Sequence, residues 1–184
     1  MSETDLAASD MRSLWHTSGP VAVEGEAPSV LRARFEVIVE PMMPDLLRYF
    51  ARRVIPREDA ADLLSETLLV LWQRRGKLPQ DPEEQRAWAY GIARKVLSNH
   101  QRKQSRRAAL GDTYLLRASL AASVPTDLSP AAEQALDALA TLPECDRELI
   151  RLVVWDGFGV GQAGAVLGMK DATARSRYAR AKAR

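Results

Sequence analysis

The stretch LIRLVVWDGFGVGQAGAVLGMKDATARSRYARAKAR, residues 149–184, decides the fold of this chain. An apolar helix is followed by a glycine-rich segment and then by a short final helix. Gly168 lies where a tight turn needs a residue that tolerates positive φ, and Asp171 is placed to cap the helix that follows. From residue 172 onward the chain has five Lys or Arg residues and no acid. The stretch predicts a helix-turn-helix whose basic second helix enters the major groove of DNA.

The side chains near the start of this final helix are the candidates for contact with duplex DNA. They are Lys170, Thr173, Arg175, Ser176 and Arg177. An Arg side chain can bind guanine through two hydrogen bonds, and Ser or Thr can bond to phosphates or base edges. Ala174, Tyr178 and Ala181 recur at helical spacing, so we expect these three to face the core.

Charge is strongly segregated along the 184 residues, although the formal net charge is only +2. Residues 94–107 hold six Lys or Arg and no acid, whereas residues 111–146 hold six acids and one Arg. The last 38 residues carry eight bases and three acids. Two basic zones separated by an acidic zone indicate two nucleic-acid contacts joined by a spacer.

The apolar pattern predicts an all-α chain of two small helical domains. Apolar residues from Ala60 to Trp72 recur at the spacing of one helical stripe, and we find no alternation typical of strands. The domains are expected at residues 30–107 and 133–184. Residues 1–29 are expected to be a mobile tail and residues 108–132 a flexible linker, because both are rich in Ser, Thr, Gly or Pro.

The second basic zone lies on a helix expected at about 85–104. Cations and polar side chains there suit a partly unpaired strand, whose phosphates are held and whose bases are stacked or hydrogen-bonded. The candidates are Tyr90, Arg94, Lys95, Ser98, Asn99 and Arg102. Trp88 is interpreted as core, and Tyr90 is the aromatic residue that we expect to be freer for contact.

Other classes of protein find little support in the sequence. The single cysteine, Cys145, excludes a disulfide framework and a thiolate metal cage, and is expected to be a small buried side chain. His16 and His100 are the only histidines, and no nucleophile–base pair, phosphate loop or metal-ligand spacing accompanies them. We therefore expect no catalytic residue, no metal and no cofactor. No apolar run approaches the ~18 residues of a membrane span, so we do not expect membrane insertion. We expect a cytoplasmic location.

Three stretches together resemble a known family. They are DAADLLSETLLVLWQR (59–74), RAWAYGIARKVLSNHQRK (86–103) and LPECDRELIRLVVWDGFGVGQAGAVLGMKDATARSRYARAK (142–182). In this order they resemble the bacterial RNA polymerase sigma factors of the extracytoplasmic-function (ECF) group, in the sigma-70 family. The resemblance covers about residues 30–184 and implies region 2 in the first domain and region 4 in the second.

The resemblance implies a role for each stretch. Asp59, Asp62 and Glu66 would face the clamp helices of the polymerase β′ subunit, although alone they indicate only a solvated face. Loop 76–85, which contains Lys77, would capture a flipped base of the −10 element. The stretch from Arg86 would help to separate and hold the −10 strands. The second-domain candidates Thr173, Arg175, Ser176 and Arg177 would read the −35 element. The implied partners are the polymerase core (β′ clamp helices and β flap), promoter DNA and an anti-sigma factor.

This chain also departs from the family pattern. Lys95 and Asn99 stand where Asn and Asp are usual, so the promoter sequence cannot be carried over. Gly161 and Gly164 lie inside the first helix of the helix-turn-helix, where each costs ~1 kcal/mol relative to Ala, so a weak helix is expected. A conventional helix-turn-helix regulator that never joins the polymerase would explain residues 142–184. It would give no reason for the acidic and basic helices of the first domain.

Overall fold

The computed structural model describes the backbone of residues 28–109 and 130–183, and side chains within 30–106 and 134–183. Within those ranges every regular element is a helix, which confirms the all-α prediction. The first region contains α2 (Pro28–Val39), η1 (Glu40–Met42), α3 (Met43–Ala51), α4 (Asp59–Gln73), η2 (Arg75–Lys77) and α5 (Pro82–Ala109). The second contains α7 (Pro130–Thr141), α8 (Glu144–Val154), α9 (Val160–Val166) and α10 (Asp171–Lys182).

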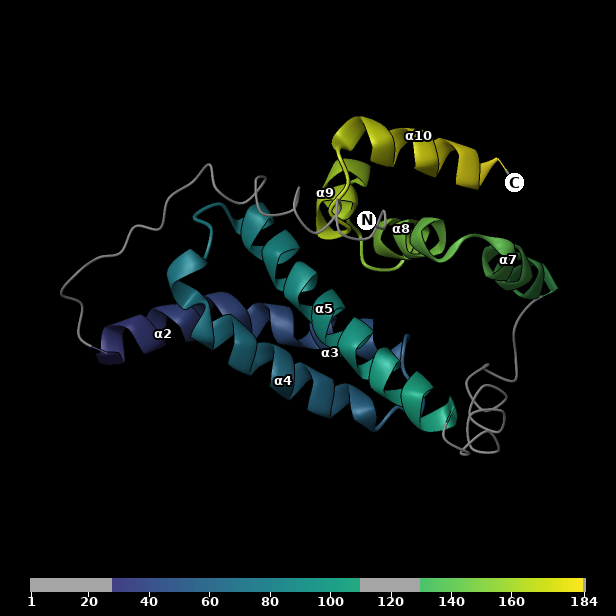
Figure 1. Cartoon of the computed structure of the whole chain (residues 1–184). Coiled ribbons are helices and arrows are strands. Elements are labelled where there is room, and N and C mark those ends of the chain that lie inside the picture. Colours follow the sequence, from purple (N-terminus) through teal and green to yellow (C-terminus); the bar gives the residue numbers. More distant parts are fainter. Residues whose placement is uncertain (1–27, 110–129, 184) are drawn as a thin grey trace, which may run out of the picture.

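The expected stripe on α4 forms the centre of the first region. Ala60, Leu63 and Leu64 are buried, and so are Thr67 and Leu71 further along the same face. This stripe packs between α3 and α5, and α5 lies across the bundle in Figure 1. The spacing of apolar residues therefore predicted both the helix and its buried face.

Helix α5 is longer than the expected span of 85–104. It begins at Pro82, a residue favoured at the first helical position because it lacks the N–H that would remain unpaired. The carboxylate of Asp81 accepts a hydrogen bond from the backbone N–H of Glu84 at 2.9 Å and so caps the helix. The last part of the predicted loop 76–85 is therefore helical.

The helix-turn-helix forms as predicted, with one correction. Gly168 has a φ of 73° at the turn, as expected. Asp171 does not cap α10: it is the first helical residue, and the capping residue is Lys170 without a side-chain bond. The Asp171 carboxylate instead accepts from Arg175 Nε at 3.0 and 3.1 Å.

The two regions are packed against each other and share a hydrophobic core. Leu46 and Phe50 of α3 belong to the same buried cluster as Leu149 and Leu152 of α8. Aromatic rings packed edge to face cross the boundary between the two regions. The ring centre of Tyr90 on α5 lies 4.7 Å from that of Phe158 in the α8–α9 loop. Figure 1 shows α8, α9 and α10 lying against one side of the first region.

The expected tail and linker lie mostly outside the described residues, which exclude 1–27 and 110–129. Helical structure reaches a few residues into the edges of both expected segments. Helix α2 already begins at Pro28, α5 continues to Ala109, and α7 begins at Pro130.

Candidate nucleic-acid and polymerase interfaces

Helix α10 presents most of its predicted DNA-reading side chains to solvent. Lys170, Thr173, Arg175 and Ser176 are exposed. On the opposite side of α10, Ala174 and Ala181 are buried and Tyr178 is half-buried against the core, as expected. The helix is thus anchored through small side chains and leaves a polar, cationic face free.

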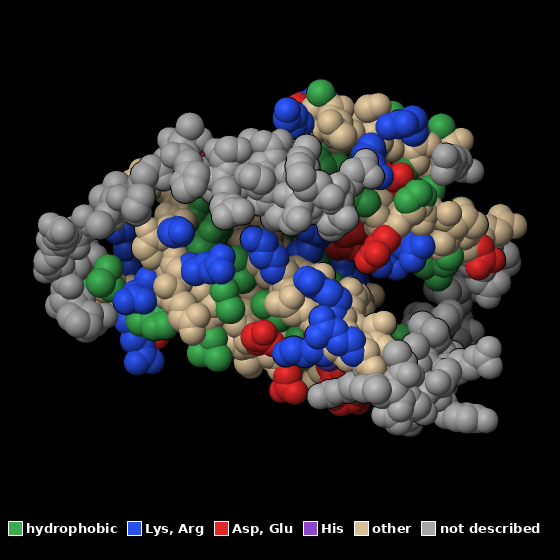
Figure 2. Space-filling view, in the orientation of Figure 1, with side chains coloured by type: hydrophobic (Ala, Val, Ile, Leu, Met, Phe, Trp, Pro, Cys, Tyr) green, Lys and Arg blue, Asp and Glu red, His purple; other side chains and the backbone are tan. Residues whose placement is uncertain are grey.

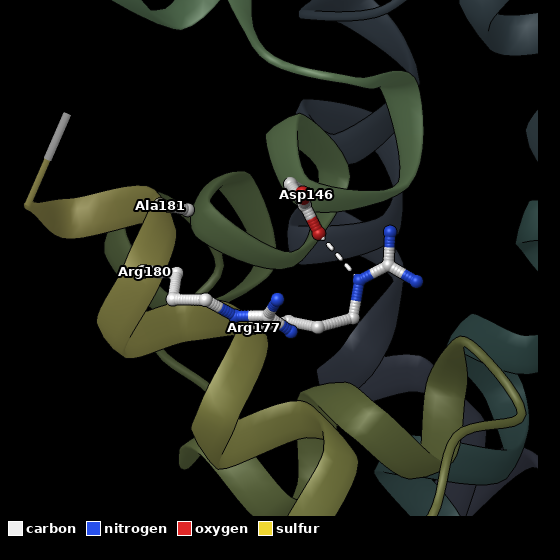
Figure 3. A pocket seen from close by; sticks show the side chains of 4 residues that line it. All are labelled: Asp146, Arg177, Arg180 and Ala181. Carbon is white, nitrogen blue, oxygen red and sulfur yellow. Dashed lines mark hydrogen bonds and ion pairs between the residues drawn. The ribbon is translucent and has the colours of Figure 1, made fainter.

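Arg177 differs from the other four candidates on and just before α10. Its Nε donates to Asp146 Oδ1 of α8 at 2.6 Å, and its side chain is only 33% exposed. Arg177 and Asp146 line a surface hollow of about 300 Å³ together with Arg180 and Ala181 (Figure 3). Arg180 is exposed beside this hollow and adds a cation that the sequence pattern did not single out.

The basic face of α5 is built from its middle turns. Lys95, Asn99 and Arg102 are exposed, whereas Arg94 and Ser98 are half-buried. Arg102 Nη2 donates to Asn99 Oδ1 at 3.2 Å and to Ser98 Oγ at 3.3 Å, so these polar groups form one cluster. In Figure 2, Lys and Arg side chains lie along the surface formed by α5. We call Lys95, Ser98, Asn99 and Arg102 the α5 basic face.

Electrostatics around the α5 basic face favour an anion. Partial burial lowers the pKa of Lys95, and the nearby cations Arg74 and Arg94 lower it further. Several positive groups are therefore held together without enough acid to neutralise them, which is the arrangement that attracts phosphate. Lys77, exposed on η2, is a further cation in the loop before α5.

Tyr90 is not the free aromatic residue that we expected. Its side chain is only 1% exposed, and its ring centre lies 5.2 Å from that of Tyr49 and 4.7 Å from that of Phe158. Burial raises the pKa of Tyr90 to about 12. The expectation failed because Tyr90 faces the second region, whose contact with α5 no local pattern reveals. Trp88 is buried, as interpreted from the sequence.

The acidic side chains of α4 fall into two environments. Asp62 and Glu66 are exposed on one face. Asp59 is half-buried, its Oδ2 lying 3.3 Å from His100 Nε2 and accepting from Gln104 Nε2 at 3.4 Å, so it ties α4 to α5. Acidic side chains are visible where α4 reaches the surface in Figure 2. The sequence grouped the three acids on one exposed face, whereas in the structure only Asp62 and Glu66 are exposed.

Metal-ligand groups and membrane spans are not found in the part of the chain that the structure describes. No group of three or more His, Cys, Asp or Glu side chains there could hold a metal ion. Cys145 is half-buried rather than buried, and burial raises the pKa of its thiol. Among the described helices, none combines the length and the apolar character needed to cross a bilayer.

Comparisons with known proteins agree with this geometry. Residues 38–107 match the Sigma-70 region 2 family, and residues 132–184 match the Sigma-70 region 4 family. The ECF RNA polymerase sigma factor SigF of Caulobacter vibrioides is 31% identical over 175 residues, which cover 94% of this chain and 87% of SigF. The ECF sigma factor SigL of Mycobacterium tuberculosis is 29% identical over 134 residues, 72% of this chain and 75% of SigL.

Solved structures show the same fold. The sigma factor RpoE of Bartonella quintana, solved with the anti-sigma factor NepR, matches with a TM-score of 0.60 and 22% identity, over 82% of this chain and 92% of RpoE. CnrH, solved with the cytosolic domain of CnrY, matches with a TM-score of 0.55 and 21% identity, over 97% and 91% of the two chains. Region 2 and region 4 are matched in order, and SigF is 31% identical over 94% of the chain, so this chain belongs to the ECF RNA polymerase sigma factors.

Proposed function

We propose that this chain directs bacterial RNA polymerase to promoters by reading the −35 element with α10 and holding the −10 strand with the α5 basic face. The observation that carries this proposal is the presence of two separate cationic faces, one in each region, beside an acidic face that stays free on α4. A conventional helix-turn-helix regulator needs only the first of these three faces.

The −35 contact rests on the exposed N-terminal turns of α10. Thr173 and Ser176 can bond to phosphates or base edges, and Arg175 can read guanine. Lys170, just before the helix, is placed for a phosphate. Arg177 joins this set only when its ion pair with Asp146 opens.

The −10 contact rests on the α5 basic face and on Lys77. Cations beside amide and hydroxyl groups can hold a phosphate backbone and bond to exposed bases of an opened strand. Asn99 and Lys95 are the two positions that differ from the usual family pattern, so they are the residues that we expect to set promoter preference.

The acidic face of α4 is proposed to dock on the polymerase. Asp62 and Glu66 project freely from a rigid helix, which suits contact with basic side chains of the β′ clamp helices. Region 4 would dock on the β flap. The chain would work in the cytoplasm and supply no bond-making chemistry of its own. By analogy with RpoE, which was solved with the anti-sigma factor NepR, an anti-sigma factor would control it.

Transcription with purified components tests the proposal. Core polymerase plus this chain, supplied with a genomic fragment library, should give transcripts whose starts share two upstream motifs. Chain that neither binds core polymerase nor supports specific initiation would overturn the proposal. A chain carrying Glu36→Gln serves as a matched control, because Glu36 is exposed on α2 and pairs only with Arg32 among the described residues.

A further inference from the structure

A buried ion-pair cluster joins the two regions. Arg53, just after α3, donates from Nη2 to Asp156 Oδ2 at 2.7 Å and from Nε to Glu148 Oε1 at 2.9 Å. The Arg53 and Asp156 side chains are 1% and 2% exposed, and Glu148 is 14% exposed. Arg53 is withdrawn from water, and both of its carboxylate partners belong to the other region. Two further cations lie at longer range: Arg151 Nη1 is 3.9 Å from Glu148 Oε2, and Arg52 Nη1 is 3.9 Å from Asp156 Oδ1. We call Arg53, Glu148 and Asp156 the Arg53 latch.

Burial also makes the Arg53 latch costly. It raises the pKa of Asp156 and that of Glu148, because both ionised carboxylates are less well solvated here than in water. One guanidinium is shared between the two carboxylates. Attraction to the same carboxylates raises the pKa of Arg53 despite its burial, so it offsets part of the cost of removing the three groups from water. A buried ion pair of this kind is specific in geometry but offers limited net stabilisation over hydrated groups, which suits a contact that opens in use.

A second layer of contacts covers the first half of α5. Arg86 donates to the backbone oxygen of Asp156, and its guanidinium lies 4.1 Å from the centre of the Phe158 ring. Phe158 also packs against Tyr90. At the edge, Gln162 Nε2 of α9 donates to Glu83 Oε2 at 2.6 Å. The segment 156–162 of region 4 thus occupies the side of α5 that carries Arg86 and Tyr90.

The covered side of α5 is the part that resembles the strand-separating stretch of region 2. With Arg86 and Tyr90 held by region 4, Lys95, Asn99 and Arg102 of the α5 basic face, further along the helix, stay exposed to solvent. The acidic residues Asp62 and Glu66 are also exposed to solvent. Docking on the polymerase can therefore precede any separation of region 4 from α5.

The packed arrangement is also too short to read both promoter elements. Elements centred near −35 and −10 are separated by about 25 base pairs, or ~85 Å of B-form duplex at ~3.4 Å per base pair. A compact chain of this length has a radius of gyration of ~16 Å and is ~40 Å across. The two regions must therefore separate before α10 and α5 can reach both elements of one promoter.

We propose that the Arg53 latch holds the free chain in a closed, autoinhibited form, and that separation of the two regions on the polymerase uncovers Arg86 and Tyr90 for promoter DNA. The role in promoter binding rests on the function proposed above. The closed form of the free chain does not, and it can be measured without polymerase.

Distances between spin labels test the closed form. Labels on Arg34→Cys in α2 and Val154→Cys in α8, both exposed positions, are placed in a Cys145→Ala background. The free chain should give one short distance, and the polymerase-bound chain a longer one. Glu148→Gln with Asp156→Asn should raise the open population of the free chain about tenfold or more, since the Arg53 guanidinium is left buried without a carboxylate partner.

Two results would overturn the closed form. One is a broad, long distance distribution in the unmodified free chain, and the other is a latch variant that keeps the short distance. Glu36→Gln, which removes an exposed ion pair within α2, is the matched control and should leave the distances unchanged. Circular dichroism checks that the latch variant keeps its helices, so that opening is not confused with unfolding.

A reversible cross-link tests whether closure is inhibitory. Cysteines replacing Glu83 and Gln162, joined by a short reagent that a reductant cleaves, would lock the closed form. Locked chain should lose promoter opening with core polymerase and recover it after reduction. The same reagent between cysteines replacing Arg32 and Glu36 on α2 is the control. Normal initiation by locked chain would refute the autoinhibition even if the chain is a working sigma factor.

Discussion

Gly164 of α9 lies so close to Ala174 of α10 that a Cβ atom added to Gly164 would be 2.5 Å from the Ala174 Cβ. Real Cβ atoms essentially never approach that closely. The sequence suggested that glycines weaken α9, because they cost helix propensity. At this position the glycine is what allows the two helices of the helix-turn-helix to meet.

Gly164→Ala is therefore expected to destabilise the protein. The extra methyl group must push α9 away from α10, which costs about 1–3 kcal/mol and exceeds the gain in helix propensity of ~1 kcal/mol. Urea unfolding followed by circular dichroism measures the change in the free energy of unfolding. A more stable variant would show that the helices separate easily.

Gly161→Ala is the matched control in the same helix. A Cβ at Gly161 would meet only the Asp171 side chain, with Oδ1 at 2.5 Å and Cγ at 3.4 Å, and that side chain is short and exposed and can rotate away. The variant should be as stable as the parent or more stable by up to ~1 kcal/mol. Equal destabilisation by both substitutions would mean that overpacking at Ala174 is not the cause.

The sequence predicted elements better than it predicted contacts between them. The period of apolar residues from Ala60 to Leu71 depends only on one helix facing one core, so α4 was predicted with its correct face. Tyr90 was misjudged because its partner Phe158 lies 68 positions away and belongs to the other region. Arg53 gave no signal at all, since an Arg near a helix end is ordinarily exposed.

Local geometry limited the remaining predictions. Asp171 and Asp81 are both acids near helix starts, yet only Asp81 caps, because Asp171 lies one position inside α10. Boundaries of this kind depend on a shift of one residue, which composition cannot resolve. Asp59 was grouped with Asp62 because they share a helix, but its neighbour His100 on α5 could be identified only from the packing.

Arg175 and Arg177 are expected to behave differently when replaced by Ala. Both variants should weaken −35 DNA binding. The slope of the logarithm of the binding constant against the logarithm of the salt concentration should fall in magnitude by about 1 for each phosphate that the variant no longer neutralises. Only Arg177→Ala should also lower the free energy of unfolding, by about 0.5–1 kcal/mol, because it breaks the partly buried pair with Asp146. Fluorescence anisotropy on −35 duplexes and urea unfolding separate the two effects.

Asp146→Asn tests whether Arg177 reads DNA at all. The substitution weakens the ion pair and frees the guanidinium while keeping the shape of residue 146. If Arg177 contacts DNA, the Asp146→Asn variant should bind the −35 duplex at least as tightly as the parent. Weaker binding, equal to that of Arg177→Ala, would assign Arg177 to positioning α10.

Tyr49 and Tyr90 should resist ionisation until the protein unfolds. Burial raises the pKa of Tyr90 to about 12 and raises that of Tyr49 further above its usual value. A raised folded-state pKa means that their contribution to stability is complete below pH ~10 and is lost as the pH rises beyond it. Tyrosinate absorbance of these two residues should therefore appear together with the loss of helical circular dichroism.

Phe substitutions identify the two tyrosines in that titration. The Tyr49 hydroxyl is buried without a hydrogen-bond partner among the described residues, so Tyr49→Phe should be neutral or slightly stabilising. Each Phe variant should remove part of the late absorbance change. An unchanged late transition in both variants would show that neither side chain is protected.

Asp62 and Glu66 are expected to act on polymerase binding without affecting stability. Both side chains are exposed, so Asp62→Asn with Glu66→Gln should leave the free energy of unfolding within about 0.5 kcal/mol of the parent. Loss of two charges that face a basic partner should slow association and weaken capture of core polymerase, most clearly at low salt. Asp59→Asn supplies the contrast, because it disturbs the contacts with His100 and Gln104 and should reduce stability as well. If the double variant bound core polymerase as tightly as the parent, the acidic face of α4 would be a solvated surface and the docking site would have to lie elsewhere on region 2.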